Sequence, residues 1–282
     1  MVYQPRIVDS ELRLRLEANG AVVIEGPKAC GKTETARQVA RSEVLLDVDA
    51  NARAAAAVAP DSVLAGVVPR LIDEWQVEPA IWNHIRRAID ERQDAGQFIL
   101  TGSAVPADDI TRHTGAARMT RLRMRPMSLL ETGHSTGAIS LRTLLASGPV
   151  ACPDPGLSVE DVVARVAIGG WPGVQARTTP QALQAMRDYL DEIRRVDISR
   201  VDNVRRDPDR VGRLLASLSR NVATSVSTST LAHDTGGADG PLKDDTAREY
   251  LAALHRLMIV EDQPAWAPHL RSRSILRTAP KR

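Results

Sequence analysis

An eight-residue segment near the N-terminus has the spacing of a phosphate-binding loop. Its sequence, GPKACGKT, fits the pattern G-x-x-x-x-G-K-[ST] and follows the apolar run Val22–Ile24. Glycines let such a loop point backbone N–H groups at phosphates, and the next helix begins with partial positive charge. The predicted cofactor-binding residues are Gly26, Pro27, Lys28, Ala29, Cys30, Gly31, Lys32 and Thr33. We expect Lys32 to reach the β- and γ-phosphates of a nucleotide and Thr33 to ligate Mg²⁺.

Two adjacent carboxylates end another apolar run. Leu71 and Ile72 precede Asp73 and Glu74. At the carboxyl end of a strand, Asp73 would complete the Mg²⁺ site and Glu74 would polarise the attacking water. Acidic pairs are also common on solvated surfaces. The position of this pair at a strand end, downstream of the phosphate-binding loop, favours the metal and catalytic roles.

Small hydroxyl residues end a further apolar run. Phe98–Leu100 is followed by Thr101, Gly102 and Ser103. A hydroxyl beside the phosphates would bond the γ-phosphate or the lytic water, so Thr101 and Ser103 are predicted catalytic residues, with an ordinary turn as the alternative. Because ligand sites form at the carboxyl ends of parallel strands, three polar features at three strand ends support one another.

The elements that must position these groups alternate between strand and helix. A polar helix is expected over 32–41. From Pro79 to Asp94 an amphipathic helix is predicted, because isoleucines recur at helical spacing. Strands are predicted at 22–24, 44–48, 70–73, 97–101 and 118–124. This alternation predicts an α/β fold with a parallel sheet.

The second half of the chain has helical periodicity. Residues 133–156 are rich in Gly, Pro and Ser, which predicts a domain at 1–135, a linker at 136–156 and a second domain at 157–282. Helices are predicted around 183–193, 211–222, 229–234 and 244–258, followed by a strand from 259 to 262. Three helices and a strand are typical of a winged helix, and a helical packing module without nucleic-acid contact is the alternative.

Composition excludes several function classes. The chain has 282 residues and a net charge of +2, so it has no global basic field for nucleic acid. Aromatic residues make up 3%, which disfavours base stacking, and two cysteines cannot build a disulfide framework or a zinc site. We expect a cytoplasmic protein without membrane contact, because no apolar run is long enough to span a bilayer and charged residues occupy the N-terminus.

Arginines gather in two places. The first group lies near the end of the first domain and consists of Arg112, Arg118, Arg121, Arg123 and Arg125. These arginines fit either a solvated strand face or an arginine finger for a neighbouring subunit, and no single residue is singled out as the finger. The second group is Arg271, Arg273, Arg277, Lys281 and Arg282. With Arg248, it would supply phosphate contacts if a winged helix binds DNA.

These segments together resemble the bacterial and archaeal ATPases with an N-terminal AAA-type domain. The resemblance is carried, in order, by EGPKACGKTETA, PRLIDEWQ, QFILTGSA, RLRMRPMSLLE, GGWPG and LDEIRRVDIS. It implies ATP and Mg²⁺ as cofactors, with Lys32, Thr33, Asp73 and Glu74 at the matching positions. It also implies a winged-helix-like domain of unknown function after the ATPase domain. Such proteins usually continue into a nuclease-like region, so the resemblance implies a shortened chain without a nuclease role.

Two functions from different classes remain open. The first is a Mg²⁺-dependent ATPase that couples hydrolysis to a partner, either duplex DNA or a protein, with oligomerisation possible. The second is a nucleotide-gated DNA-associated regulator or toxin–antitoxin-like binding protein with little turnover. Glu74 favours hydrolysis, because binding alone needs no water-polarising carboxylate. A small-molecule kinase would share the phosphate-binding loop, but the second domain resembles no acceptor-binding lid.

Overall fold

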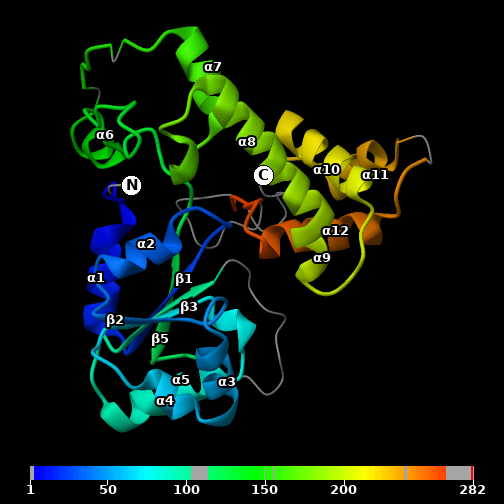
Figure 1. Ribbon diagram of the computed structural model, residues 1–282. Coiled ribbons are helices and arrows are strands. Elements are labelled where there is room, and N and C mark those ends of the chain that lie inside the picture. The colour runs from blue at the N-terminus through cyan, green and yellow to red at the C-terminus, as the bar shows by residue number, and fades with distance from the viewer. Residues whose placement is uncertain are drawn as a thin grey trace, which may run out of the picture. The chain divides into compact units, whose positions relative to one another are not determined.

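The computed structural model describes residues 3–102, 114–148, 150–154, 156–237, 240–264 and 281. The chain divides into two compact units (Figure 1). The first comprises Met1–Ser103 and Asp108–Arg187, and the second comprises Ala104–Ala107 and Asp188–Arg282. The division falls within helix α8 (Thr179–Glu192), which begins in the first unit and ends in the second.

The first unit is built on a five-stranded parallel sheet with the order β2-β3-β4-β1-β5. The strands are β1 (Ala21–Glu25), β2 (Ser42–Leu45), β3 (Arg70–Asp73), β4 (Phe98–Gly102) and β5 (Met119–Arg123). Strand β1 lies between β4 and β5, with Ile24 opposite Thr101 of β4 on one side and opposite Leu122 of β5 on the other. The predicted α/β fold with a parallel sheet is therefore confirmed, and all five expected strands form, although β2 ends at Leu45 and not at the predicted residue 48.

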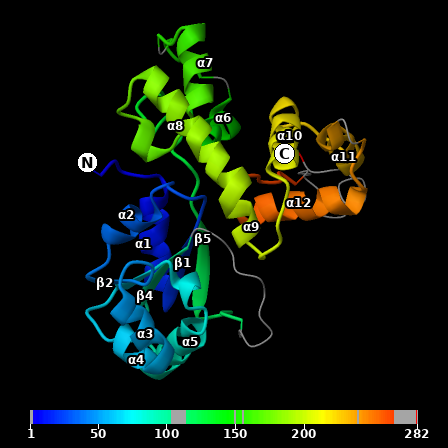
Figure 2. The ribbon, with the colours of Figure 1, turned by 45° about the vertical axis from the view of Figure 1, so that its right-hand side comes forward.

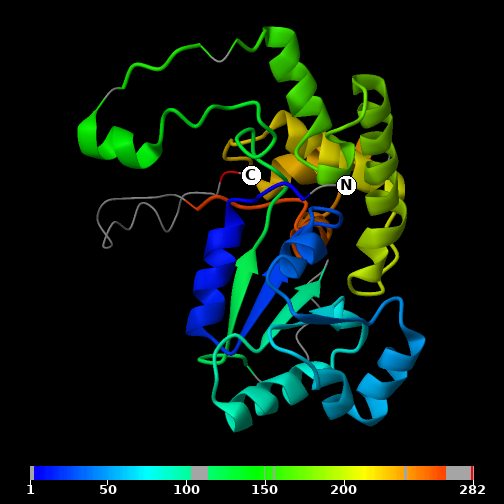
Figure 3. The same ribbon diagram turned by 60° about the vertical axis from the view of Figure 1, so that its left-hand side comes forward.

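Helices cover both faces of this sheet (Figure 3). In chain order, the helices that pack on the sheet are α1 (Val8–Ala18), α2 (Lys32–Arg37), α3 (Ala50–Val58), α4 (Pro60–Leu64) and α5 (Ile81–Arg92). Successive residues of a strand point to opposite faces. Accordingly Val22 and Ile24 pack with α1 and α2, whereas Ala21 and Val23 pack with α3, α4 and α5.

The sequence predicted the position and the buried face of α5 correctly, but it placed the end of α2 too far along the chain. The α5 isoleucines at 81, 85 and 89 are all buried, together with Trp82. The helix expected at 32–41 is shorter, because α2 ends at Arg37. Helices α1, α3 and α4 were not predicted. Their apolar faces are narrow: only Leu12 and Leu16 are buried in α1, and only Ala56 in α3.

The first unit continues beyond the sheet. Its later elements are α6 (Leu141–Ser147), α7 (Val159–Ile168), the short 3₁₀ turn η2 (Pro172–Val174) and the first part of α8. Helix α7 starts with a capping box, in which the Ser158 side chain accepts from the Asp161 N–H and the Asp161 carboxylate accepts from the Ser158 N–H. Ile168, Val174 and Ala182 form a small buried cluster that joins α7, η2 and α8. Figure 2 shows α7 and α8 side on.

The second unit is helical, as expected. After α8 come the π-helical turn η3 (Ile193–Asp197), α9 (Ile198–Arg200), α10 (Pro208–Arg220), α11 (Thr228–Gly236) and α12 (Asp244–Arg256). The three helices predicted around 211–222, 229–234 and 244–258 are therefore present. Val211 and Leu214 of α10 pack with Leu231 of α11 and with Leu251 and Leu254 of α12.

The strand predicted at 259–262 does not form. Residues 259–262 have no strand conformation, and Gln263 instead makes an isolated antiparallel bridge to Lys281. The chain turns sharply before this point, because Met258 has a left-handed backbone (φ 59°) and the Ile259 N–H bonds the Leu254 carbonyl. The described residues thus contain the three helices of the proposed winged helix without its wing.

No helix in the described part of the chain has both the length and the apolar character to cross a lipid bilayer.

Candidate nucleotide-binding site

The predicted phosphate-binding loop leaves the carboxyl end of strand β1, which lies between β4 and β5. Its first glycine is required by close packing, since a Cβ on Gly26 would lie 2.3 Å from the Met124 carbonyl oxygen. The loop then turns tightly, with the Cys30 N–H bonded to the Pro27 carbonyl at 3.3 Å. Gly31 has φ 103°, a conformation that side chains disfavour. Both glycines of the motif therefore serve the backbone path of the loop.

Lys32 lies inside the curve of this loop. Its Nζ donates to the carbonyl oxygens of Gly26 and Pro27, each at 3.0 Å. The side chain is buried although it is charged. A buried ammonium needs hydrogen-bond partners, and the loop carbonyls supply them here. The lysine thus points back over the loop from the first turn of α2, where phosphates would lie.

One carboxylate oxygen links the other predicted groups. Asp73 Oδ1 accepts a hydrogen bond from the Thr33 hydroxyl at 2.9 Å and a second, short one from the Thr101 hydroxyl. Thr33 belongs to the loop, Asp73 ends β3 and Thr101 lies near the end of β4. Because β3, β4 and β1 are neighbours in the sheet, their carboxyl ends meet at one edge. The structure therefore brings together three of the residues singled out from the sequence.

Glu74 follows Asp73 with a left-handed backbone (φ 51°). This conformation is uncommon for a residue with a side chain. The Gln76 amide donates a short hydrogen bond to Glu74 Oε2 and holds the carboxylate. Gln76 Oε1 is itself buried and accepts no hydrogen bond from the described residues. From its position two residues after Glu74, Gln76 could either fix this loop or only pack, and its hydrogen bond to Glu74 favours the first.

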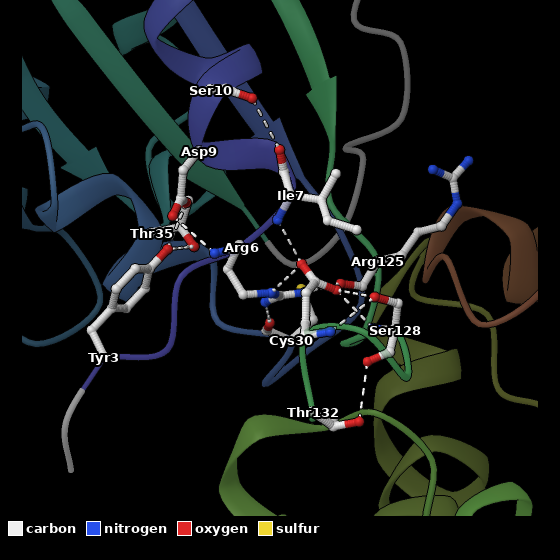
Figure 4. A network of polar contacts seen from close by, with 11 residues as sticks. Tyr3, Arg6, Ile7, Asp9, Ser10, Cys30, Thr35, Arg125, Ser128 and Thr132 are labelled. Atoms are coloured by element: carbon white, nitrogen blue, oxygen red, sulfur yellow. Dashed lines mark hydrogen bonds and ion pairs between the residues drawn. The ribbon is translucent and has the colours of Figure 1, made fainter. Parts of the chain in front are cut away.

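A buried ion pair between Arg6 and Glu131 supports the phosphate-binding loop (Figure 4). Arg6 Nε contacts Glu131 Oε1 at 2.9 Å, and the two side chains are only 4% and 7% exposed. The other guanidinium nitrogens donate to the carbonyl oxygens of Cys30, at 2.9 Å, and Arg125, at 2.8 Å. Arg6 thus ties the loop to the segment after β5. Nothing local to Arg6 or Glu131 in the sequence marks them as partners.

Glu131 is held as a carboxylate by several donors. Burial by itself would raise its pKa, but hydrogen bonds from the Ser128 and Ile7 N–H groups, the Ser128 hydroxyl and Arg6 lower it. The resulting pKa lies below the ordinary value. The ion pair is therefore charged at neutral pH.

The GGWPG segment also contacts the loop. The Trp171 indole N–H donates to the Lys28 carbonyl at 3.1 Å. Next to it, the Met127 N–H donates to the Gly170 carbonyl at 2.6 Å, and a Cβ on Gly170 would lie 2.0 Å from the Met127 carbonyl oxygen. Only glycine allows this approach. The segment is thus fixed against the loop by backbone packing within the first unit.

Other predicted residues have different outcomes. Ser103 and Arg112 lie outside the described residues. Arg118 pairs with Asp90 at 2.5 Å, and Arg121 pairs with Glu25 and stacks over Trp82. These pairings favour the strand-face interpretation for Arg118 and Arg121. Cys30 is fully buried and its pKa is raised by burial, which suits a passive packing residue.

The donor set at Asp73 suits magnesium. Mg²⁺ prefers oxygen ligands and is commonly held by one or two protein groups together with phosphates and water. The Thr33 hydroxyl and the Asp73 carboxylate are such groups, and they already lie in contact. No group of three or more His, Cys, Asp or Glu that would hold a metal occurs within the described part of the chain. The described residues therefore do not form a metal site made of protein ligands alone.

Comparison with known families supports this assignment of the fold. Residues 18–133 match a family model described as AAA domain, and residues 159–282 match one described as Domain of unknown function (DUF8612). Among solved structures, the Walker-type ATPase PABY2304 of Pyrococcus abyssi is similar over 90% of each chain, with a TM-score of 0.52 and 14% sequence identity. No curated protein matches the sequence.

The two family matches fall in the order that the sequence motifs implied, and the fold comparison spans both of them. At 14% identity, the solved structure shows a shared fold and nothing more. The similarity of the motifs to ATPases with an N-terminal AAA-type domain is therefore confirmed. Residues 18–133 are similar to AAA domains, and residues 159–282 are similar to a family of domains of unknown function.

Proposed function

We propose that this protein binds ATP with Mg²⁺ at the loop of Gly26–Thr33 and hydrolyses it. The observation that carries the proposal is the shared contact of Thr33, Asp73 and Thr101 through one carboxylate oxygen. This contact lies beside the phosphate-binding loop of an AAA domain. The pattern supports nucleotide binding at this edge of the sheet, because the loop after β1 and the ends of β3 and β4 converge on one place.

Each residue has a defined task in the proposed reaction. Lys32 exchanges its two loop carbonyls for the β- and γ-phosphates, which are stronger partners because they are charged. Thr33 and Asp73 hold Mg²⁺, which when bound offsets the negative charge of the phosphates. Glu74, oriented by Gln76, positions the attacking water and accepts its proton. Thr101 and Ser103 are the hydroxyl residues proposed to act at the γ-phosphate.

The test separates binding from turnover. We expect Glu74→Gln to bind ATP with near-normal affinity and to hydrolyse it at least ~10²-fold more slowly, because an amide cannot accept the proton. Lys32→Ala should instead weaken ATP binding. Calorimetric titration and phosphate release from the purified full chain measure the two effects. Glu17→Gln is the matched control, because Glu17 is exposed on α1.

The outcomes distinguish the two function classes. Hydrolysis by Glu74→Gln equal to that of the wild type would remove the catalytic role and favour a nucleotide-gated binding protein. Unchanged ATP affinity in a folded Lys32→Ala variant would remove the phosphate-binding assignment altogether. The proposed partner of the second domain is a protein, with duplex DNA as the alternative, and the proposed location is the cytoplasm.

A further inference from the structure

A cavity of about 500 Å³ opens beside the phosphate-binding loop. Its walls come from the N-terminal segment, from the segment after β5 and from the turn after the GGWPG sequence, all within the first unit. Gly31 of the loop and Glu34 of α2 also line it. Its size lies within the ~300–1,000 Å³ typical of small-molecule sites. None of the steps proposed above for the phosphate site takes place in this cavity.

The sheet order indicates which end of a nucleotide would face the cavity. Strand β1 has β4 and then β3 on one side and β5 on the other. The groups proposed for the γ-phosphate, Asp73 and Thr101, lie on the β3–β4 side. Met127 and His134, which line the cavity, follow β5. A triphosphate with its γ end towards Asp73 therefore directs its nucleoside end towards the cavity.

Part of the cavity wall is flat and apolar and suits a planar base, although polar residues line the rest. Tyr3, Met127 and Pro172 line it. The Tyr3 hydroxyl donates to Asp9 at 2.6 Å and bonds the Thr35 hydroxyl at 3.0 Å, so the ring is held in place before any ligand arrives (Figure 4). A rigid aromatic wall favours binding of flat rings, because little side-chain freedom is lost when the ligand binds.

One polar side chain in the cavity wall has a fixed orientation. Gln175 Nε2 donates to the carbonyl oxygens of Gly169, at 2.9 Å, and Trp171, at 3.1 Å. Both amide hydrogens are therefore used, and no described residue donates to the Gln175 oxygen. Gln175 can thus offer a ligand an acceptor and no donor.

From these observations we infer that the cavity binds the adenine base of the nucleotide, with Gln175 as a specificity-determining residue. An acceptor pairs with the exocyclic amine of adenine. The same acceptor repels the carbonyl oxygen that guanine and hypoxanthine carry at that position. The inference rests on the proposed phosphate site, and it makes residues 172–176 of the second family's domain part of the nucleotide site.

The test compares three ligands on the full chain by calorimetric titration with Mg²⁺: ATP, ITP and inorganic tripolyphosphate. We expect ATP to bind at least ~10-fold more tightly than tripolyphosphate, and ITP to bind ~10-fold more weakly than ATP. In Gln175→Leu, the preference for ATP over ITP should fall to less than about 2-fold. Equal binding of ATP and ITP by the wild type would overturn the role of Gln175.

A cavity-filling variant keeps the inference testable if Gln175→Leu does not fold. Ala176 lines the cavity and is exposed, so Ala176→Leu adds bulk there without disturbing the core. We expect it to weaken ATP binding ~10-fold and to leave tripolyphosphate binding unchanged. Ala54→Leu on α3, also at an exposed alanine, is the matched control.

The failure of this inference and the failure of the proposed function are distinguishable. If wild type binds ATP and tripolyphosphate equally, the phosphate site stands and the base cavity is wrong. The base cavity is equally wrong if Ala176→Leu lowers both affinities or neither. If neither ligand binds the folded wild type, the proposed ATP-binding function itself is overturned.

Discussion

Asp73 is the residue on which the proposed catalytic edge depends. Its Oδ1 accepts hydrogen bonds from Thr33 and Thr101. Both hydroxyls donate to Oδ1, so they fix the orientation of the carboxylate, and neither of them bonds Oδ2. Asp73 is buried, and a buried carboxylate is costly without such donors. The two hydroxyls therefore hold the proposed metal ligand in one orientation.

The Thr101 hydroxyl can be removed with little change in shape. We expect Thr101→Val to weaken Mg²⁺-dependent ATP binding several-fold and to slow hydrolysis ~10-fold, because Asp73 loses one of its two donors. The free energy of unfolding should fall by about 1 kcal/mol, the usual contribution of one hydrogen bond. Magnesium titrations at fixed ATP measure the first effect and thermal unfolding the last.

Thr178→Val provides the matched control for this prediction. Thr178 is exposed, and its side chain has no hydrogen bond within the described residues. A Thr101→Val variant with the Mg²⁺ dependence and turnover of this control would show that Asp73 does not need the second hydroxyl.

At the scale of elements, the Arg6–Glu131 pair joins three segments. Arg6 lies just before α1, its guanidinium bonds the loop at Cys30, and Glu131 lies in the segment after β5. Glu131 in turn accepts from the Ile7 N–H at 2.8 Å and the Ser128 N–H at 2.7 Å. The loop is thus held in place by two charged side chains that are hydrogen-bonded to each other and to neighbouring backbone groups.

Removing the arginine leaves a buried carboxylate without its cation. We expect Arg6→Met to lower the free energy of unfolding by about 3–5 kcal/mol, as is typical when one partner of a buried pair is lost. Denaturant titration measures this change. Arg13→Met on the exposed side of α1 should cost much less. Similar costs for the two variants would show that the buried pair contributes no more than a surface arginine.

The lowered pKa of Glu131 makes this stabilisation depend on pH. Hydrogen bonding to the ionised form stabilises the fold at pH values above the ordinary pKa of the carboxyl, near 4.5, and this stabilisation is lost as the pH falls towards the lower pKa of the folded state. The Gln side chain of Glu131→Gln does not ionise, so this variant lacks the pH-dependent contribution to stability. The stability difference between wild type and Glu131→Gln should therefore be constant at neutral pH and shrink below about pH 4.5.

Denaturant titrations of both proteins from pH 7 to pH 3.5 measure this difference. A difference that stays constant over the whole range would show that Glu131 does not titrate with folding.

At the scale of the whole molecule, the charges of the second unit are largely compensated. Arg248 pairs with Asp245 at 2.7 Å, and Arg220 pairs with Asp234 at 3.2 Å. The whole chain has a net charge of +2. Arg271 and Arg273, the other predicted phosphate contacts, lie outside the described residues. Compensated arginines contribute little to the field that attracts nucleic acid.

We therefore expect weak binding of duplex DNA or none, with or without ATP, at physiological salt. Fluorescence anisotropy with a labelled duplex at 50 and 200 mM salt measures it. Tight binding that falls with salt, with a log–log slope near −0.9 per phosphate, would contradict this expectation and support the winged-helix interpretation. Arg271→Ala with Arg273→Ala would then flatten the slope by about two.

The sequence alone was sufficient to predict the strands and the loop of the proposed site. Each of these features is local: an apolar run ends, and a glycine, carboxylate or hydroxyl follows within a few residues. The order of the strands then places Thr33, Asp73 and Thr101 together, because parallel strands all present their carboxyl ends at one edge. The helices α1 and α3 were missed, since they bury few residues and their periodicity is correspondingly weak.

Only the tertiary structure decided which distant residues support the loop. Arg6 and Glu131 are 125 residues apart, and Trp171 is 143 residues from Lys28. No local pattern marks such pairs, because each contact exists only after the sheet has formed and both segments lie against the same loop. The orientation of Gln175 depends in the same way on two backbone carbonyls that the fold presents. The sequence thus determined which groups can do phosphate chemistry, and tertiary packing decided what braces them and what can bind beside them.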